Sequence, residues 1–247
     1  MSATPFTSLN NKEIRAYARE RLLGNMFIPV MITIFVYSTR FTFEMVLSLG
    51  VLGRDLFSFF FYIALFIVVN SIWGIIKYGI CNFYLSFITG KNANPIRILS
   101  GFRQSTEVII CASLFLTVIN VILMLPYLIY TFFFSPNNYL GLGVSFLLLL
   151  VANLFSLLIE SYLAPLYFVI CDYPGMRLTM VIIMTLSLMN TRNFFKYLFL
   201  QISFIPLYIL GMISCGIGLL WVTPYVNTSY AYFYENLCLS YKPEGEN

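Results

Sequence analysis

The sequence predicts an all-α protein, a polytopic transmembrane helix bundle of about six spans with short cytoplasmic interfacial helices. Hydrophobic residues make up 60% of the 247 residues and charged residues only 10%, whereas soluble domains carry about 25% charged residues. Long apolar stretches recur along the chain, and about 20 apolar residues suffice to cross a hydrocarbon core about 30 Å thick. The polar stretches between them are too short to bury a core of their own, so residues 1–247 should form a single membrane domain.

This domain divides into three parts by composition. An amphipathic cytoplasmic segment covers residues 1–25, the transmembrane bundle covers 26–238, and a polar tail covers 239–247. The six spans are expected near residues 26–46, 57–78, 108–133, 143–170, 195–213 and 217–238.

Two of these spans are unusual. The last is the weakest candidate because it carries Asn227, Thr228 and Ser229, so whether it crosses the membrane stays open. The second apolar run continues beyond its span as far as Ile88. One helix over 57–88 would measure about 48 Å at 1.5 Å per residue, so it should tilt or project into the cytoplasm.

The distribution of Lys and Arg predicts the orientation. Short cytoplasmic loops are enriched in these residues, and most of the cations here lie in segments of one parity, which begins with the amino terminus. The amino terminus is therefore expected in the cytoplasm of a cell-membrane protein, and six crossings would return the carboxyl terminus there. The cations in segments of this parity are Lys12, Arg15, Arg19 and Arg21, then Lys91, Arg97 and Arg103, then Arg177, Arg192 and Lys196, and finally Lys242.

The chain also suggests a threefold repeat of a short amphipathic helix followed by two spans. In the third unit, the apolar run over 176–189 is too short to cross and is expected to lie at the interface. Basic loops of any membrane protein would give a similar impression, so the repeat and the simpler explanation both stay open. The candidate residues for docking at this interface are Arg97, Arg103, Arg177, Arg192 and Lys196.

Catalysis is disfavoured by the residue types that are missing. The chain contains no His, which removes the commonest metal ligand and proton carrier. Its five cysteines form no CxxC pair and are best read as packing residues. No Walker sequence and no GxSxG is present. We therefore expect no enzyme activity, no catalytic residue, no metal and no cofactor, and the small dispersed net charge of +4 argues against nucleic acid.

Ionisable residues inside the spans are the remaining candidates. Arg40 and Glu44 are four residues apart, so they share a helix face and can pair as an interfacial anchor. Glu160 lies near the middle of its span, where a charge is costly and by default marks a function or needs a partner. Lys77 is its best candidate partner, at comparable depth, although Lys77 could instead extend to the surface. The pair Glu160 and Lys77 is either functional or simply holds helices together.

Several segments of the chain resemble the bacterial membrane family called domain of unknown function 975. The resemblance covers nearly the whole chain, is strongest over residues 170–237, and implies a six-helix membrane fold typical of Gram-positive bacteria with no established activity. This chain departs from the expected pattern by carrying Asn190 where Gly was expected. The segments that carry the resemblance are ERLLGN, LSGF at Gly101, Asp172 and Pro174, Leu188 and Met189, and GIGLLWVTPY followed by Tyr230, Phe233 and Tyr234.

Two functions are compatible with these observations. The first, which the sequence favours, is a non-catalytic membrane component that binds the lipid bilayer or another membrane protein through its basic interfacial helices. The second is a small transporter or channel with a polar path around Glu160, which proline-kinked helices would suit. A polar cavity reaching Glu160 would favour the second, whereas a dry bundle would favour the first.

Overall fold

Every regular element that the structure describes is a helix. The computed structural model describes residues 9–49, 56–90, 94–103, 106–134 and 139–241. The helices are α1 (Asn11–Leu22), α2 (Phe27–Leu49), α3 (Leu56–Ile88), the 3-10 helix η1 (Pro95–Phe102), α4 (Thr106–Phe134), α5 (Tyr139–Tyr162), α6 (Leu166–Asp172), α7 (Leu178–Leu188), α8 (Thr191–Ile202), α9 (Ile205–Ile213) and α10 (Leu219–Tyr241).

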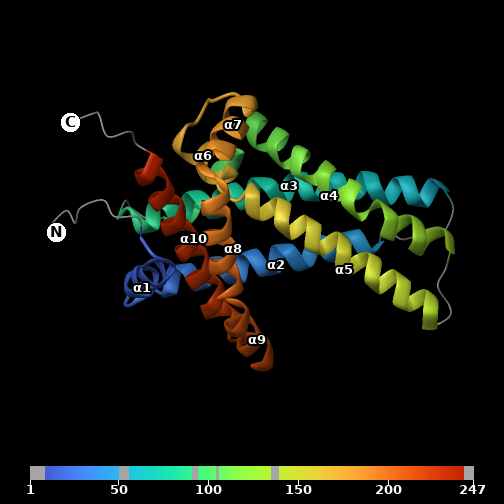
Figure 1. The fold of residues 1–247 in the computed structure, drawn as a ribbon, viewed down its shortest axis with the longest axis horizontal. Helices are drawn as coiled ribbons and strands as arrows, with labels where there is room; N and C mark the ends of the chain where they lie inside the picture. The colour runs from blue at the N-terminus through green and yellow to red at the C-terminus, as the bar shows by residue number, and fades with distance from the viewer. Residues whose placement is uncertain (1–8, 50–55, 91–93, 104–105, 135–138, 242–247) are drawn as a thin grey trace.

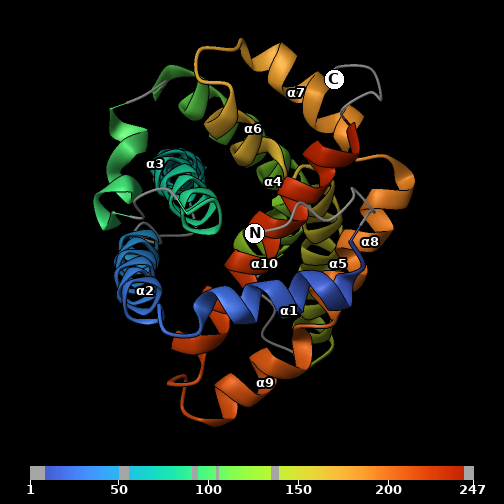
Figure 2. The ribbon, with the colours of Figure 1, turned by 90° about the vertical axis from the view of Figure 1, so that its left-hand side faces the viewer.

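The helices form two groups that run in different directions. Helices α2 to α5 run along the long axis of the molecule (Figure 1). Helices α1 and α6 to α10 gather toward one end of them, at the left of Figure 1. Viewed from that end, α2 and α3 are seen nearly end-on, whereas α10 runs across the view (Figure 2). We call this the basic end, because it holds α1, η1, α7 and α8 with their cations, and we call the opposite ends of α2 to α5 the distal end.

Five helical segments of the described chain are long and apolar enough to cross a membrane. The second predicted span is a single helix of 33 residues, as the apolar run to Ile88 indicated. The 11-residue helix α7 is too short to cross, in agreement with the short interfacial segment predicted over 176–189. The five segments are Phe27–Ser48, Leu56–Ile88, Thr106–Phe134, Tyr139–Asp172 and Thr191–Ile213.

The sixth predicted span forms a helix, α10, that is not among these five. Its polar residues do not face lipid, because Thr228 and Ser229 are fully buried and their hydroxyls donate to main-chain carbonyls one turn back, at 2.7 and 2.8 Å. Helix α10 packs against α1, α2 and α3. Because most of this helix contacts other helices of the protein, its side chains can be less apolar than those of the five segments above.

The order of elements matches the predicted repeat. A short helix is followed by two long helical segments three times: α1 before α2 and α3, η1 before α4 and α5 with α6, and α7 before α8 with α9 and α10. Two prolines mark the places where long segments are interrupted. Pro165 directly precedes α6, and Pro206 lies in the first turn of α9. Pro126 and Pro224 lie inside the continuous helices α4 and α10.

Close packing at the basic end depends on glycine, and Gly79 is the tightest case. Helix η1 lies on α3, and a Cβ atom added at Gly79 would be 1.8 Å from the main-chain oxygen of Ile98. No side chain larger than hydrogen therefore fits at this contact.

The amino-terminal end of α1 is closed by a capping box. The main-chain N–H of Asn10 donates to the Glu13 carboxylate at 2.7 Å.

Candidate functional site

A cavity with a mixed apolar and polar wall lies where seven helices converge. It has a volume of about 370 Å³ and is lined by residues of α2, α3, α4, α5, α6, α8 and α10. Its walls combine apolar side chains with polar and ionisable groups, as ligand pockets commonly do. The polar and aromatic lining residues are Trp73, Lys77, Tyr84, Glu160, Tyr167, Phe168, Tyr197, Gln201, Asn227 and Tyr230.

Glu160 reaches this cavity from α5 and is held by neutral partners. Its carboxylate accepts a hydrogen bond from the Asn120 amide of α4 at 3.2 Å. The Asn120 carbonyl oxygen in turn accepts from the Ser156 hydroxyl. These hydrogen bonds link α4 to α5 and fix the position of the Glu160 carboxylate. Glu160 remains exposed, so part of the carboxylate is accessible.

The predicted ion pair between Lys77 and Glu160 is not formed. In the described part of the chain, the ion pair within 4.0 Å joins Arg40 to Glu44 instead. Lys77 is half-buried and Glu160 is exposed, so the prediction of a buried pair was wrong. The reason is the packing order: α4 packs against both α3 and α5 and separates the helices that carry the two residues. Both nevertheless line the same cavity.

Two further polar groups of the cavity bear on what it could bind. The Gln201 carbonyl oxygen accepts from the Ser161 hydroxyl at 2.8 Å, which fixes the orientation of its amide. The Tyr84 hydroxyl is buried beside the side chains of Thr33 and Asn227, so polar groups of α2, α3 and α10 meet at this wall of the cavity.

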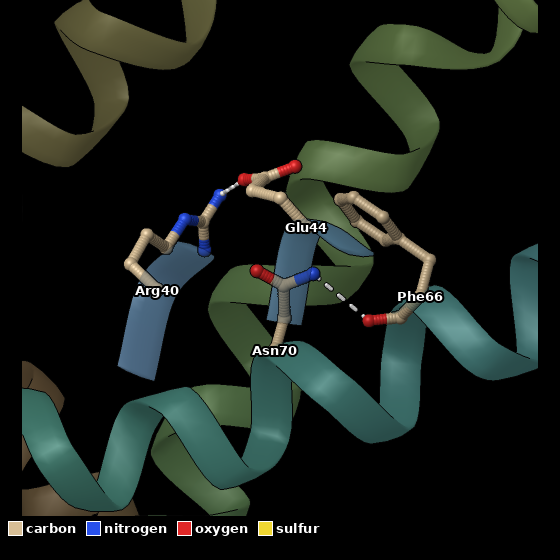
Figure 3. Close-up of polar contacts among 4 residues, drawn as sticks. All are labelled: Arg40, Glu44, Phe66 and Asn70. Atoms are coloured by element: carbon tan, nitrogen blue, oxygen red, sulfur yellow. Dashed lines mark hydrogen bonds and ion pairs between the residues drawn. The ribbon is translucent and has the colours of Figure 1, made fainter. Parts of the chain in front are cut away.

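The ionisable pair of the first span lies beside the same cavity. The Arg40 guanidinium is 2.5 Å from the Glu44 carboxylate, which confirms the predicted pairing. Figure 3 shows Asn70 of α3 pointing toward this pair while its amide donates to the Phe66 carbonyl at 2.9 Å. The guanidinium carbon also lies 5.4 Å from the centre of the Trp73 ring, which lines the cavity. The pair therefore braces one cavity wall.

The five predicted docking residues do not form one site. Arg97 and Arg103 line a second cavity, of about 760 Å³, at η1, where Arg97 also donates to the Ser86 hydroxyl. Arg177 and Arg192 are exposed, Lys196 is half-buried, and none of these three lines that cavity. What the five share is their place at the basic end and the absence of an ion pair within the described residues.

A third cavity, of about 770 Å³, was not anticipated from the sequence. It lies against α1 and is lined by Lys12, Arg15 and Arg19 together with apolar residues of α9 and α10. The signal that could have revealed it is the spacing of these cations, which places them along one side of a helix. The opposite wall of this cavity is formed by residues about 200 positions later in the chain, and the spacing within α1 gives no indication of them.

The fold defines the class to which this protein conforms. Five helical segments of the described residues are long and apolar enough to cross a membrane, and many of their apolar side chains are exposed, as in multi-pass helical membrane proteins. A family profile described as "Protein of unknown function (DUF975)" matches residues 8–240. The chain belongs to this family. No curated protein and no solved structure matches it.

Proposed function

We propose that the protein is a non-catalytic, multi-pass protein of the cell membrane that works as a small transporter or channel with a polar path around Glu160. The observation that carries this proposal is the cavity of about 370 Å³ that holds both Glu160 and Lys77. Ionisable groups in a membrane interior are costly and mark substrate or ion pathways by default. Since the two residues do not neutralise each other, each is available to a solute.

This proposal is tested by measuring whether the cavity is accessible to aqueous solvent. In a variant without native cysteines, Gln201→Cys and Asn227→Cys should react with a small, charged, membrane-impermeant thiol reagent applied from one side of the membrane. Leu150→Cys is the matched control, because Leu150 is exposed on α5 and does not line the cavity. It should remain unlabelled in lipid. If neither cavity position reacts while the protein is folded, the transport proposal fails.

A second function is favoured by the free cations of the basic end. We propose as the alternative a membrane component that docks on anionic lipid or another membrane protein through Arg97, Arg103, Arg177, Arg192 and Lys196. Interfacial cations without carboxylate partners retain their attraction for anionic groups. Affinity purification of the intact protein from its native membrane tests this alternative. Co-purification of a stable partner that is lost on replacing the exposed cations by Gln would support it, and purification of the wild type alone would oppose it.

The orientation is proposed with the amino and carboxyl termini in the cytoplasm. Its support is the charge distribution, because most described cations lie at the end that holds α1, η1 and α7. Single cysteines at positions 95 and 191 should be labelled only from the cytoplasm. Cysteines at 52 and 138, which lie outside the described residues, should be labelled only from outside. Cytoplasmic labelling at 138 would overturn the proposed topology.

A further inference from the structure

The cavity against α1 has cations on one side and apolar side chains on the other. Lys12, Arg15 and Arg19 line it from α1. Leu207 of α9 and Trp221 of α10 are among the residues that line it from the carboxyl-terminal helices. The cavity has a volume of about 770 Å³, which is within the range of small-molecule sites.

Helix α1 is built so that these cations face the cavity. The helix is anchored by Ile14, Ala18 and Leu22, which recur every four residues and are all buried. The three cations occupy positions i, i+3 and i+7 beside that buried stripe, so they are neighbours along the helix surface. From Lys12 to Arg19 the helix rises about 10 Å. A row of positive charge of this length can contact more than one phosphate oxygen at once.

The positive charge of this cavity is not neutralised by the protein. No Asp or Glu is among the residues that line the cavity, and none of the three cations forms an ion pair in the described part of the chain. Neither of α1's own carboxylates, Glu13 and Glu20, lines the cavity, and Glu13 accepts a hydrogen bond from the Asn10 main-chain N–H. An anion in this cavity would therefore meet three cations without displacing a protein partner.

The remaining wall is suited to an acyl chain. Trp221 is half exposed, and Leu207, Met26 and Val222 extend the apolar surface around it. Tryptophan is enriched where a membrane protein meets the headgroup region, because its ring is apolar with one polar edge. The Tyr225 hydroxyl donates to the Arg15 main-chain oxygen at 3.4 Å and so joins the apolar wall to the cationic one.

We propose that this cavity is a binding site for an anionic phospholipid. The headgroup phosphate lies against Lys12, Arg15 and Arg19, and an acyl chain lies along Leu207 and Trp221. The argument rests on charge complementarity and on the position of the site at the basic end, where α1 enters the first span. The site is separate from the central cavity at Glu160, so this proposal and the transport proposal can fail independently.

Native mass spectrometry of the full-length protein in detergent, titrated with phosphatidylglycerol or phosphatidylcholine, tests the site. Phosphatidylglycerol should bind more tightly than phosphatidylcholine. The triple change Lys12→Gln, Arg15→Gln, Arg19→Gln should weaken phosphatidylglycerol binding by about fivefold per cation, or about a hundredfold in total. The matched control is Arg21→Gln, which removes a cation of the same helix that does not line this cavity and should weaken binding much less than a single change inside the cavity.

Three further measurements keep the result decisive. If the triple variant does not fold, the single changes Lys12→Gln and Arg19→Gln, both at exposed positions, should each give about a fivefold loss. Trp221→Ala should also weaken phosphatidylglycerol binding, and millimolar inorganic phosphate should not displace the lipid. A loss from Arg21→Gln equal to the losses from Lys12→Gln and Arg19→Gln would overturn the proposal in favour of diffuse charge attraction. Displacement by phosphate with no effect of Trp221→Ala would overturn it in favour of a soluble anion.

Discussion

Helices α5 and α10 have similar lengths but opposite environments. Of the 24 residues of α5, only Ala152 and Ser161 are buried, and its Leu and Phe side chains are largely exposed. In the 23-residue α10, both apolar and polar residues are buried, from Val226 to Leu237. The apolar helix therefore faces lipid and the mixed helix faces protein. Stability should consequently reside at the basic end, while the distal end depends on the bilayer.

The largest expected difference between the two regions concerns phenylalanine. Phe204 is 0% exposed and packs edge-on against Tyr225 with ring centres 5.5 Å apart, whereas Phe146 of α5 is 61% exposed. Phe204→Ala should destabilise the protein by about 3–5 kcal/mol, because it leaves a cavity among packed side chains. Phe146→Ala should have little effect, since lipid or detergent replaces the lost contacts. Thermal unfolding of both variants in the same detergent measures the difference, and equal losses would mean that the distal half is packed in the native protein.

Glycine gives the second contrast. Gly79→Ala would place a methyl group on the main-chain oxygen of Ile98, so η1 must move off α3, and we expect a loss of about 3 kcal/mol. Gly143 lies in α5, and a Cβ atom there meets nothing within 4 Å. Gly143→Ala should therefore be neutral or stabilise the helix by up to about 1 kcal/mol. The two melting temperatures should move in opposite directions or differ widely; a similar small shift in both would show that the η1 contact is loose.

A third prediction concerns coupling inside the cavity. Asn120 and Glu160 are hydrogen-bonded, whereas Lys77 and Glu160 are separated by α4. In double-mutant cycles to alanine, Asn120 and Glu160 should show a coupling of about 1 kcal/mol, the usual size for polar pairs in membrane proteins. Lys77 and Glu160 should show clearly less. A larger coupling for the Lys77 cycle would indicate that the two charges pair directly in the native membrane.

The smallest effect is expected at the ion pair of α2. Arg40 and Glu44 are close together, but their side chains are 38% and 54% exposed, and pairs of this kind on a helix contribute about 0.5 kcal/mol or less. A double-mutant cycle of Arg40→Gln and Glu44→Gln, followed by unfolding in low and high salt, measures this contribution. A coupling above about 1 kcal/mol that does not fall with salt would show that the pair is shielded from water.

Local sequence patterns predicted local structure well. The pairing of Arg40 with Glu44 follows from spacing within one helix, and it is present. The continuous helix to Ile88 follows from an unbroken apolar run. Each of these predictions depends only on residues a few positions apart or on composition, so no knowledge of helix packing was required.

Predictions that depended on packing between helices were less successful. Comparable depth in the membrane suggested that Lys77 and Glu160 pair, but depth does not reveal that α4 lies between their helices. Hydropathy made α10 the weakest span, and it cannot distinguish a helix surrounded by protein from one that does not cross. The cavity at α1 joins Arg15 to Trp221, and no periodicity within the chain relates positions so far apart.

The length of α3 has a consequence for how the protein responds to its membrane. Its 33 residues extend about 50 Å at 1.5 Å per residue, some 20 Å more than a typical hydrocarbon core. Its last turns are held by η1, α6 and α10, so this part cannot readily tilt or slide. A thinner or thicker bilayer would then have to be accommodated by the loosely packed distal ends of α2 to α5. Hydrophobic mismatch should therefore deform one end of the molecule and leave the other unchanged.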